Sequence, residues 1–227
     1  MQGVHLAFFF YSVHCRHMYR DKHRLTEVDM IRFLFYSIGL LCLSLGVSFV
    51  IHANMGAGPW DALAVGESRL FHLTIGTCIF LNGCILIGVN AFLLKERPRW
   101  LAALSIFLIG QLVDFWLRVT EAVLIPSDLV SQILFVLIGT TLIGLGISIY
   151  LQAGLPSSPM DTLMMALHHR FGLNLNHARL LNEAIAITLA ITAGGSIGIG
   201  TLIVACTLGS VIHFFYPIIE RMYGKLT

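Results

Sequence analysis

Residues 54–63 read NMGAGPWDAL, and residues 154–163, one hundred positions later, read GLPSSPMDTL. The two stretches share the pattern Pro-x-Asp-x-Leu, with the acid at Asp61 and at Asp161. When residues 38–82 are laid over residues 138–182 without a gap, thirteen of the forty-five positions are identical. Shared apolar composition explains only some of these identities, so the chain is interpreted as two copies of one unit. Repeats in apolar chains are typical of transporters and pores.

The composition of the chain indicates a membrane protein. Hydrophobic residues make up 57% of the 227 residues and charged residues 11%, whereas soluble domains carry about 25% charged residues. A helix of about 20 apolar residues crosses the hydrocarbon core. Six stretches are therefore predicted to span the membrane: 31–51, 76–94, 100–118, 129–151, 179–195 and 200–219. No stretch is left for a soluble catalytic domain, so no enzyme activity is expected.

Each copy of the repeat holds three of these predicted spans. Because three is odd, the second copy must enter the membrane from the opposite side. We therefore predict an all-α protein of two inverted three-helix repeats, at about residues 30–125 and 126–227, related by a two-fold axis in the membrane plane. The third spans match when the offset is reduced by one, which aligns Asp114 with His213 and Gly110 with Gly209.

Small residues follow one stripe of the first span in each copy. Ser44, Gly46 and Ser48 correspond to Gly144, Gly146 and Ser148. Such stripes allow two helix backbones to approach closely, so we expect the first and fourth spans to cross at the symmetry axis. The alternative is that small residues are simply common in membrane helices.

The turn before each Pro-x-Asp motif carries helix-start signals. Proline suits the first helical position, which places Pro59 and Pro159 there. Ser158 is then the predicted N-cap, and Gly58 takes the same place without a hydroxyl group. The segments 52–75 and 152–178 are each long enough for a helix of about three turns. Two placements remain open: these helices lie along the membrane interface, or they re-enter the bundle with their N-termini at an internal cavity.

Asp61 and Asp161 have a structural and a functional interpretation. An acid at the third helical position stabilises the helix dipole by about 0.3–1 kcal/mol. Ionisable groups within the membrane are costly, so the same aspartates are also candidates for solute or proton binding. The further candidates for a solute or proton site are polar residues within the predicted spans: Asp114, His213, Glu183, Asn82 and Asn182. Asn82 and Asn182 correspond by the repeat and are expected to hydrogen-bond across the bundle.

Cysteine and histidine spacing predicts no metal site and no cofactor. The five cysteines form no Cys-x-x-Cys pair, and four lie in predicted spans, where small buried thiols are the expected reading.

Lysine and arginine distribution predicts the orientation in the membrane. With both termini in the cytoplasm, the inner segments hold twelve of these residues and the outer segments only Arg69 and Arg118. Anionic lipid is a better expected partner for the basic flanks than nucleic acid. Residues 1–29 lack the order of charge and apolar core that a signal peptide has. They are interpreted as a poorly ordered extension, or as the product of an upstream start codon, before a single domain at 30–227.

The motifs resemble the YczE/YitT-type integral membrane family. The resemblance lies in Gly-x-Gly-Pro-Trp-Asp-x-Leu at 56–63, Ser-Pro-Met-Asp-Thr-Leu at 158–163, and GIGTL at 198–202. It covers nearly the whole chain from Met30 onward. It implies a bacterial plasma-membrane protein and supplies no catalytic residues.

The sequence as a whole favours a small-solute transporter, with proton coupling as an added hypothesis. The alternative is a membrane accessory protein that supports a partner enzyme or complex at its cytoplasmic face. In that case the basic segments Lys95–Arg99 and Arg221–Lys225 are expected to matter more than the aspartates.

Overall fold

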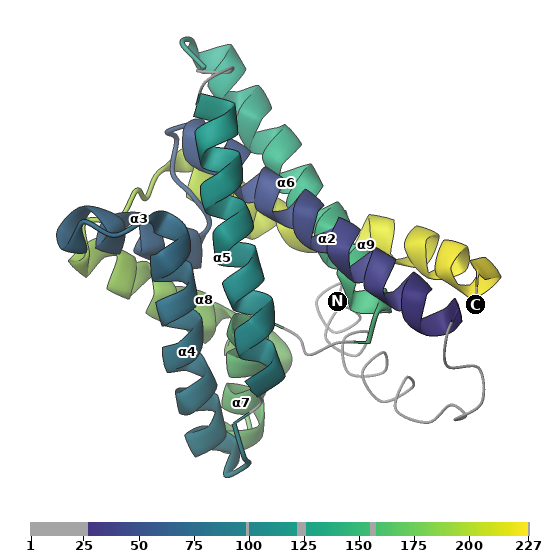
Figure 1. Cartoon of the computed structure of the whole chain (residues 1–227). Coiled ribbons are helices and arrows are strands. Elements are labelled where there is room, and N and C mark those ends of the chain that lie inside the picture. The colour runs from purple at the N-terminus through teal and green to yellow at the C-terminus, as the bar shows by residue number, and fades with distance from the viewer. Residues whose placement is uncertain (1–26, 99, 122–125, 155–157, 227) are drawn as a thin grey trace.

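The computed structural model describes residues 27–98, 100–121, 126–154 and 158–226. All regular structure in these ranges is helical (Figure 1). The predicted N-terminal extension up to residue 26 and Arg99 lie outside the described residues. The helices are α2 (Glu27–His52), α3 (Pro59–Phe71), α4 (Ile75–Leu94), α5 (Trp100–Glu121), α6 (Leu129–Gln152), α7 (Pro159–Phe171), α8 (Leu175–Thr192) and α9 (Ile199–Leu226).

Five of these helices are long and apolar enough to cross a membrane: α2 from Met30, α4, α5, α6 and α9. The predicted fifth span corresponds to α8, which does not meet the same hydropathy criterion. Its first half holds Arg179, Asn182 and Glu183, which lower the mean hydropathy of a helix of 18 residues. The all-helical class and the multiple apolar helices are confirmed, and the sixth span stays a prediction.

The two short helices that the sequence predicts after the first and fourth spans are present as α3 and α7. Both have 13 residues, both begin at the predicted proline, and both end at the phenylalanine that the repeat shares. The repeated stretch therefore folds locally in the same way twice.

Helices α2 and α6 cross at glycines (Figure 1). A Cβ on Gly46 would lie 2.6 Å from the carbonyl oxygen of Gly139, and a Cβ on Gly146 would lie 2.7 Å from that of Gly39. Gly39 corresponds to Gly139 in the repeat and Gly46 to Gly146. These four glycines therefore permit the crossing: Gly46 and Gly146 belong to the predicted stripe of small residues, and Gly39 and Gly139 lie outside it. Ser48 instead shares a hydrogen bond of 2.9 Å with Thr120 of α5.

The remaining helix contacts mostly come in pairs that the repeat relates. Helix α5 packs on α2, and α9 packs on α6. Helix α3 packs on α8 and α4, while α7 packs on α4 and α8. One pair breaks this pattern: α4 and α5 pack along each other, whereas the corresponding α8 and α9 are not among the packed helix pairs.

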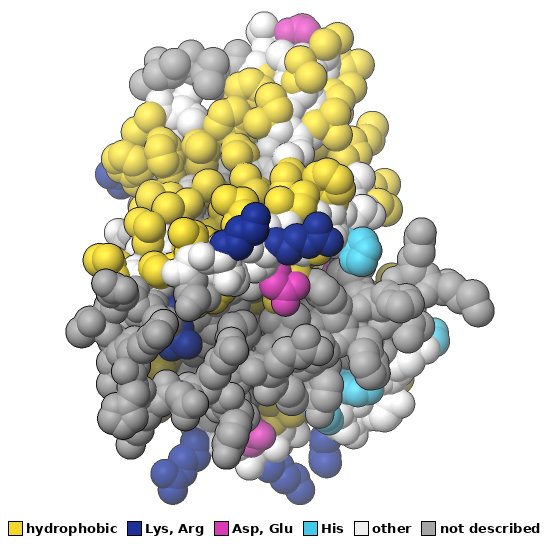
Figure 2. Space-filling model, turned by 90° about the vertical axis from the view of Figure 1, so that its right-hand side faces the viewer, with side chains coloured by type: hydrophobic (Ala, Val, Ile, Leu, Met, Phe, Trp, Pro, Cys, Tyr) yellow, Lys and Arg dark blue, Asp and Glu magenta, His cyan; other side chains and the backbone are white. Residues whose placement is uncertain are grey.

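Large apolar side chains cover much of the outer surface. Examples with more than half of their area exposed are Phe33, Phe92, Trp100, Leu202 and Phe214. Figure 2 shows apolar side chains gathered over one part of the molecular face, with Lys and Arg side chains below them. Exposed apolar surface on this scale suits a hydrocarbon environment, where contact with lipid tails carries no penalty.

Candidate functional site

The short helices α3 and α7 place Asp61 and Asp161 in the third helical position. Ser158 is the N-cap of α7, as predicted, and its hydroxyl accepts a hydrogen bond from the N–H of Met160 at 3.3 Å. Gly58 is the N-cap of α3 and has no side-chain cap. Within the described chain, neither aspartate accepts a hydrogen bond from its own helix end. Both carboxylates are partly buried and remain available for other partners.

The first motif turn rests on a loop from the other half of the chain. Two backbone hydrogen bonds join the first turn to the α8–α9 segment. The N–H of Ala57 donates to the carbonyl oxygen of Ser196 at 3.1 Å, and the N–H of Gly200 donates to the carbonyl oxygen of Met55 at 2.8 Å. Gly56 has φ 104°, and a Cβ there would lie 2.4 Å from the backbone nitrogen of Gly198, so only glycine fits.

The first turn of α7 lies beside α4 and the loop that follows α4. The amide of Asn90 donates to the carbonyl of Pro159 at 2.8 Å. Asn90, Arg97 and Thr162 line a small pocket beside this contact. The side chain of Asn90 is buried, and its Oδ1 atom has no hydrogen-bond partner. The pocket is polar at one side and of a size that suits water.

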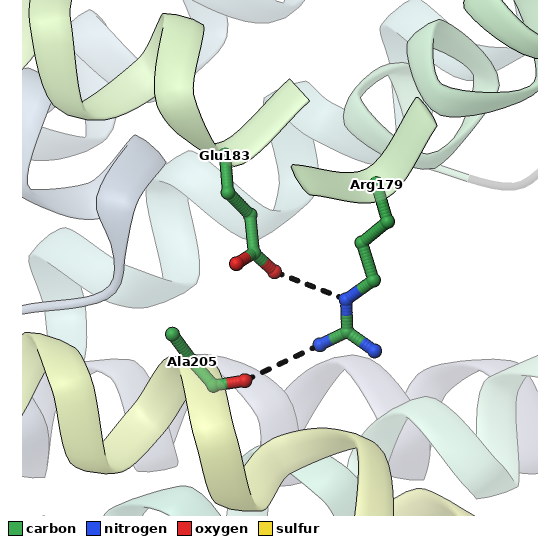
Figure 3. A network of polar contacts seen from close by, with 3 residues as sticks. All are labelled: Arg179, Glu183 and Ala205. Carbon is green, nitrogen blue, oxygen red and sulfur yellow. Dashed lines mark hydrogen bonds and ion pairs between the residues drawn. The ribbon is translucent and has the colours of Figure 1, made fainter. Parts of the chain in front are cut away.

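The structure brings Asp161 and Glu183 together around Arg179. The Nε atom of Arg179 donates to Glu183 Oε1 at 3.0 Å, and the Nη2 atom donates to the carbonyl oxygen of Ala205 on α9 at 3.4 Å (Figure 3). Burial raises the pKa of Asp161 to about 6, and the nearby Arg179 guanidinium opposes this rise. We define the charged cluster as Asp161, Arg179 and Glu183.

Asp61 has no comparable cation beside it. Burial alone raises the pKa of its carboxyl to about 6. A Cβ on Gly58 would lie 2.9 Å from its Oδ2 atom, so this carboxylate lies directly over the turn that precedes α3. The two motif aspartates thus share a position in the repeat and differ in their electrostatic surroundings.

Two other predicted site residues have structural partners instead. Asp114 of α5 accepts a hydrogen bond of 2.8 Å from the N–H of Gly76, in the first turn of α4. Asn82 donates to Glu67 Oε2 at 2.6 Å. The expected bond between Asn82 and Asn182 is not formed, and the Oδ1 atom of Asn182 has no partner. His213 lies on an exposed face of α9.

Two residues of these networks were missed by sequence reasoning. Arg179 was counted only as one of the inner basic residues, and Glu67 was not considered. The signal for Arg179 was its i,i+4 spacing to Glu183 within an otherwise apolar stretch, which predicts an ion pair on one helix face. Nothing in the sequence singles out Glu67, because its partner Asn82 lies on the next helix.

The described residues hold no group of three or more His, Cys, Asp or Glu side chains that could bind a metal ion. Cys42, Cys78, Cys84 and Cys206 are free thiols. The chemistry of the charged cluster is therefore that of a carboxylate pair and a guanidinium, which can exchange protons and bind charged groups.

Apolar helices with exposed apolar side chains, enclosing a charged cluster, define a multi-pass helical membrane protein. The chain belongs to the family described as "Family of unknown function (DUF6198)", whose model matches residues 30–217. The resemblance to YczE-type proteins that the motifs carry is thereby confirmed.

Curated relatives match the chain over most of their length. The uncharacterized protein YyaS of Bacillus subtilis is 38% identical over 85% of this chain and 96% of its own. The uncharacterized membrane protein YczE of the same bacterium is 32% identical over 83% of this chain and 86% of its own. An uncharacterized protein of Haemophilus influenzae is 31% identical over 87% of this chain and 88% of its own. No solved structure matches the chain.

Proposed function

We propose that this protein is a small-solute transporter of the bacterial plasma membrane, without enzyme activity, whose two halves are inverted three-helix repeats. The observation that carries the proposal is the charged cluster of Asp161, Arg179 and Glu183 among apolar helices. Charged groups there are costly, and they commonly mark solute or proton pathways. Structural needs do not explain Arg179 and Glu183, because the corresponding positions of the first half, Ile79 and Gly83, are apolar.

The paired helix contacts support the inverted arrangement. Gly39 meets Gly146 while Gly46 meets Gly139, which is the crossed pattern that a two-fold axis produces. Contacts at the motifs support it as well, since the first turn bonds to the α8–α9 loop and the start of α7 accepts a bond from Asn90 of α4. In this arrangement α8 is the sixth span.

Burial in α3 favours re-entry of this short helix over an interfacial position. The five consecutive residues from Ala62 to Gly66 are all buried, whereas an interfacial helix keeps one face in water. Re-entrant helices would direct the N-termini of α3 and α7, and with them Asp61 and Asp161, toward a shared interior. Binding at such half-helix ends near the repeat interface is the general plan of many secondary transporters.

Reconstitution tests the proposal directly. The purified full chain in liposomes, with an imposed pH gradient, is expected to take up at least one solute from a panel of radiolabelled metabolites. Asp61→Asn and Asp161→Asn are expected to lower this uptake at least tenfold, because each removes a proton-exchanging group. Glu220→Gln, at an exposed position of α9, is the matched control and should retain uptake.

Uptake that survives both aspartate substitutions would contradict the proton role. A panel in which no solute moves, together with intact cellular phenotypes of the aspartate variants, would contradict transport and favour the accessory role.

A further inference from the structure

Three corresponding positions differ in character between the two halves. Ile79, Gly83 and Ile106 of the first half align with Arg179, Glu183 and Ala205 of the second. In the first half they form a tight apolar contact between α4 and α5: Ile79 is 4% exposed, Ile106 is 2% exposed, and a Cβ on Gly83 would lie 2.6 Å from Ile106 Cγ1. At these three positions the fold therefore closes the helix pair with apolar residues.

In the second half the same positions carry an ion pair that remains open to its surroundings. The side chains of Arg179 and Glu183 are 36% and 24% exposed. An ion pair of this exposure, spaced i,i+4 on one helix, contributes little to stability. Both side chains point toward α9 (Figure 3), from which α8 is parted. Stability therefore gives no reason for placing these charges here.

The guanidinium of Arg179 is only partly used by its neighbours. Glu183 occupies the Nε side, and Nη2 makes one long bond to Ala205 at 3.4 Å. Within the described residues, Nη1 makes no hydrogen bond, and it lies 3.0 Å from where a Cβ on Gly209 would be. The edge formed by Nη1 and Nη2 is the fork that holds two oxygens of a carboxylate or a phosphate group. Glycine at 209 lets the guanidinium lie close to the backbone of α9, where a side chain would crowd Nη1.

We propose that the Nη edge of Arg179 binds the carboxylate or phosphate group of an anionic solute between α8 and α9, in competition with Glu183. The proposal rests on the proposed transport function and names its substrate class. Glu183 keeps the guanidinium paired when the solute is absent, and releases part of that interaction when the solute anion arrives.

Opposite effects of the two partners test this assignment. The full chain is placed in phosphatidylcholine nanodiscs, and its Tm is measured with sodium succinate or sodium phosphate against sodium chloride of equal ionic strength. One or both probes should raise the Tm of the wild type, because a ligand that binds the folded state stabilises it. Glu183→Gln should tighten binding about tenfold, since the competing carboxylate is gone. Arg179→Gln should weaken binding about thirtyfold or more.

A purely structural ion pair gives a different result, because both substitutions would then lower the Tm without changing its dependence on the probes. Arg179→Lys keeps the charge and loses the fork, so it should weaken binding even if Arg179→Gln fails to fold. Gly209→Ala should weaken binding by crowding Nη1. Arg118→Gln, at an exposed position of α5, should leave binding unchanged.

A second set of nanodiscs with phosphatidylglycerol separates a free solute from a lipid headgroup. If the anionic lipid itself raises the Tm and abolishes the effect of phosphate, the headgroup is the source of the anion, and the binding chemistry stands. Absence of any probe effect on the wild type, or equal changes in both partner variants, would overturn the proposal. Transport of neutral or cationic solutes without anion binding would overturn the proposal and leave the transport function intact. Anion binding without any uptake would do the reverse.

Discussion

The helix pairs α4–α5 and α8–α9 occupy corresponding places in the two halves and differ in how they are closed. Gly76 and Gly110 bring α4 and α5 into backbone contact, and Asp114 joins the same ends by accepting from the N–H of Gly76. The second pair keeps Gly209 but sets Arg179 against it. The corresponding helix pairs thus differ: α4 and α5 pack tightly through apolar residues, whereas α8 and α9 are further apart and meet through the side chain of Arg179.

The difference teaches that the charges of the second half are additions to a scaffold that folds without them. Where both copies carry the same residues, as at the turns and the glycine crossings, we infer that folding requires those residues. Where one copy has an ion pair in place of apolar residues, we infer that the ion pair serves a purpose other than folding.

The largest expected effect comes from adding a methyl group to the corresponding glycines Gly110 and Gly209. A Cβ on Gly110 would lie 2.4 Å from the carbonyl oxygen of Gly76, which is backbone and cannot yield without moving α4. Gly110→Ala should therefore lower the free energy of unfolding by about 3 kcal/mol. A Cβ on Gly209 meets the flexible end of Arg179, so Gly209→Ala should cost less than about 1 kcal/mol.

Unfolding by SDS in mixed micelles, followed by circular dichroism, measures both changes. Gly88→Ala is the control within α4, because a Cβ there would meet nothing within 4 Å. It should be neutral or slightly stabilising through helix propensity. Equal losses in Gly110→Ala and Gly209→Ala would show that the two helix pairs are packed alike, against the comparison.

A smaller effect is expected at the corresponding asparagines. Asn82 and Asn182 are 7% and 8% exposed, but only Asn82 has the carboxylate of Glu67 as a partner. Leu167 stands at the position that corresponds to Glu67. Asn82→Leu should therefore cost about 1 kcal/mol, while Asn182→Leu should be neutral or stabilising, since it removes a buried oxygen without a partner.

The same SDS titration measures this difference, and a double-mutant cycle isolates it. The cost of Asn82→Leu should shrink in a Glu67→Leu background, because the hydrogen bond is then already lost. An unchanged cost would assign the effect of Asn82 to packing rather than to its bond with Glu67.

Much of the fold could be predicted from identities between the two copies. The offset of one hundred residues located both short helices, their proline starts and the Ser158 cap. It also indicated that α2 and α6 cross. It named Gly46 and Gly146 among the small residues at the crossing, but not their partners Gly39 and Gly139, which lie about two helical turns further from the motif.

The candidate site was predicted less well because it depends on differences between the copies. Asp161 and Glu183 were candidates from their chemistry, whereas their shared partner Arg179 has an isoleucine as its counterpart and was passed over. Asp114 was expected to exchange protons. It lies on α5 and accepts a hydrogen bond from the first turn of α4, a capping role that only the packing of the two helices reveals.

The smallest expected effect is a pH dependence that differs between the two motif aspartates. Burial raises the pKa of both carboxyls from 3.8 to about 6, so the folded state binds more protons than the unfolded state between these values. The free energy of unfolding therefore falls as the pH rises from 3.8 to about 6. Because both side chains keep part of their surface open, the fall is smaller than the pKa values alone would give. Asp61→Asn and Asp161→Asn should each flatten part of this dependence in a series of Tm measurements.

Arg179→Gln sharpens the comparison because only Asp161 has this cation beside it. Loss of the guanidinium should raise the pKa of Asp161 further and move its part of the transition to higher pH, while the part due to Asp61 stays in place. Glu67, whose pKa is raised by burial and lowered by its bond to Asn82, contributes a background that neither aspartate variant removes. The shift should therefore be present in Asp61→Asn combined with Arg179→Gln and absent in Asp161→Asn combined with Arg179→Gln. A shift of equal size in both combinations would mean that Arg179 acts on the protein as a whole, and the two halves would no longer differ in the electrostatics of their motif aspartates.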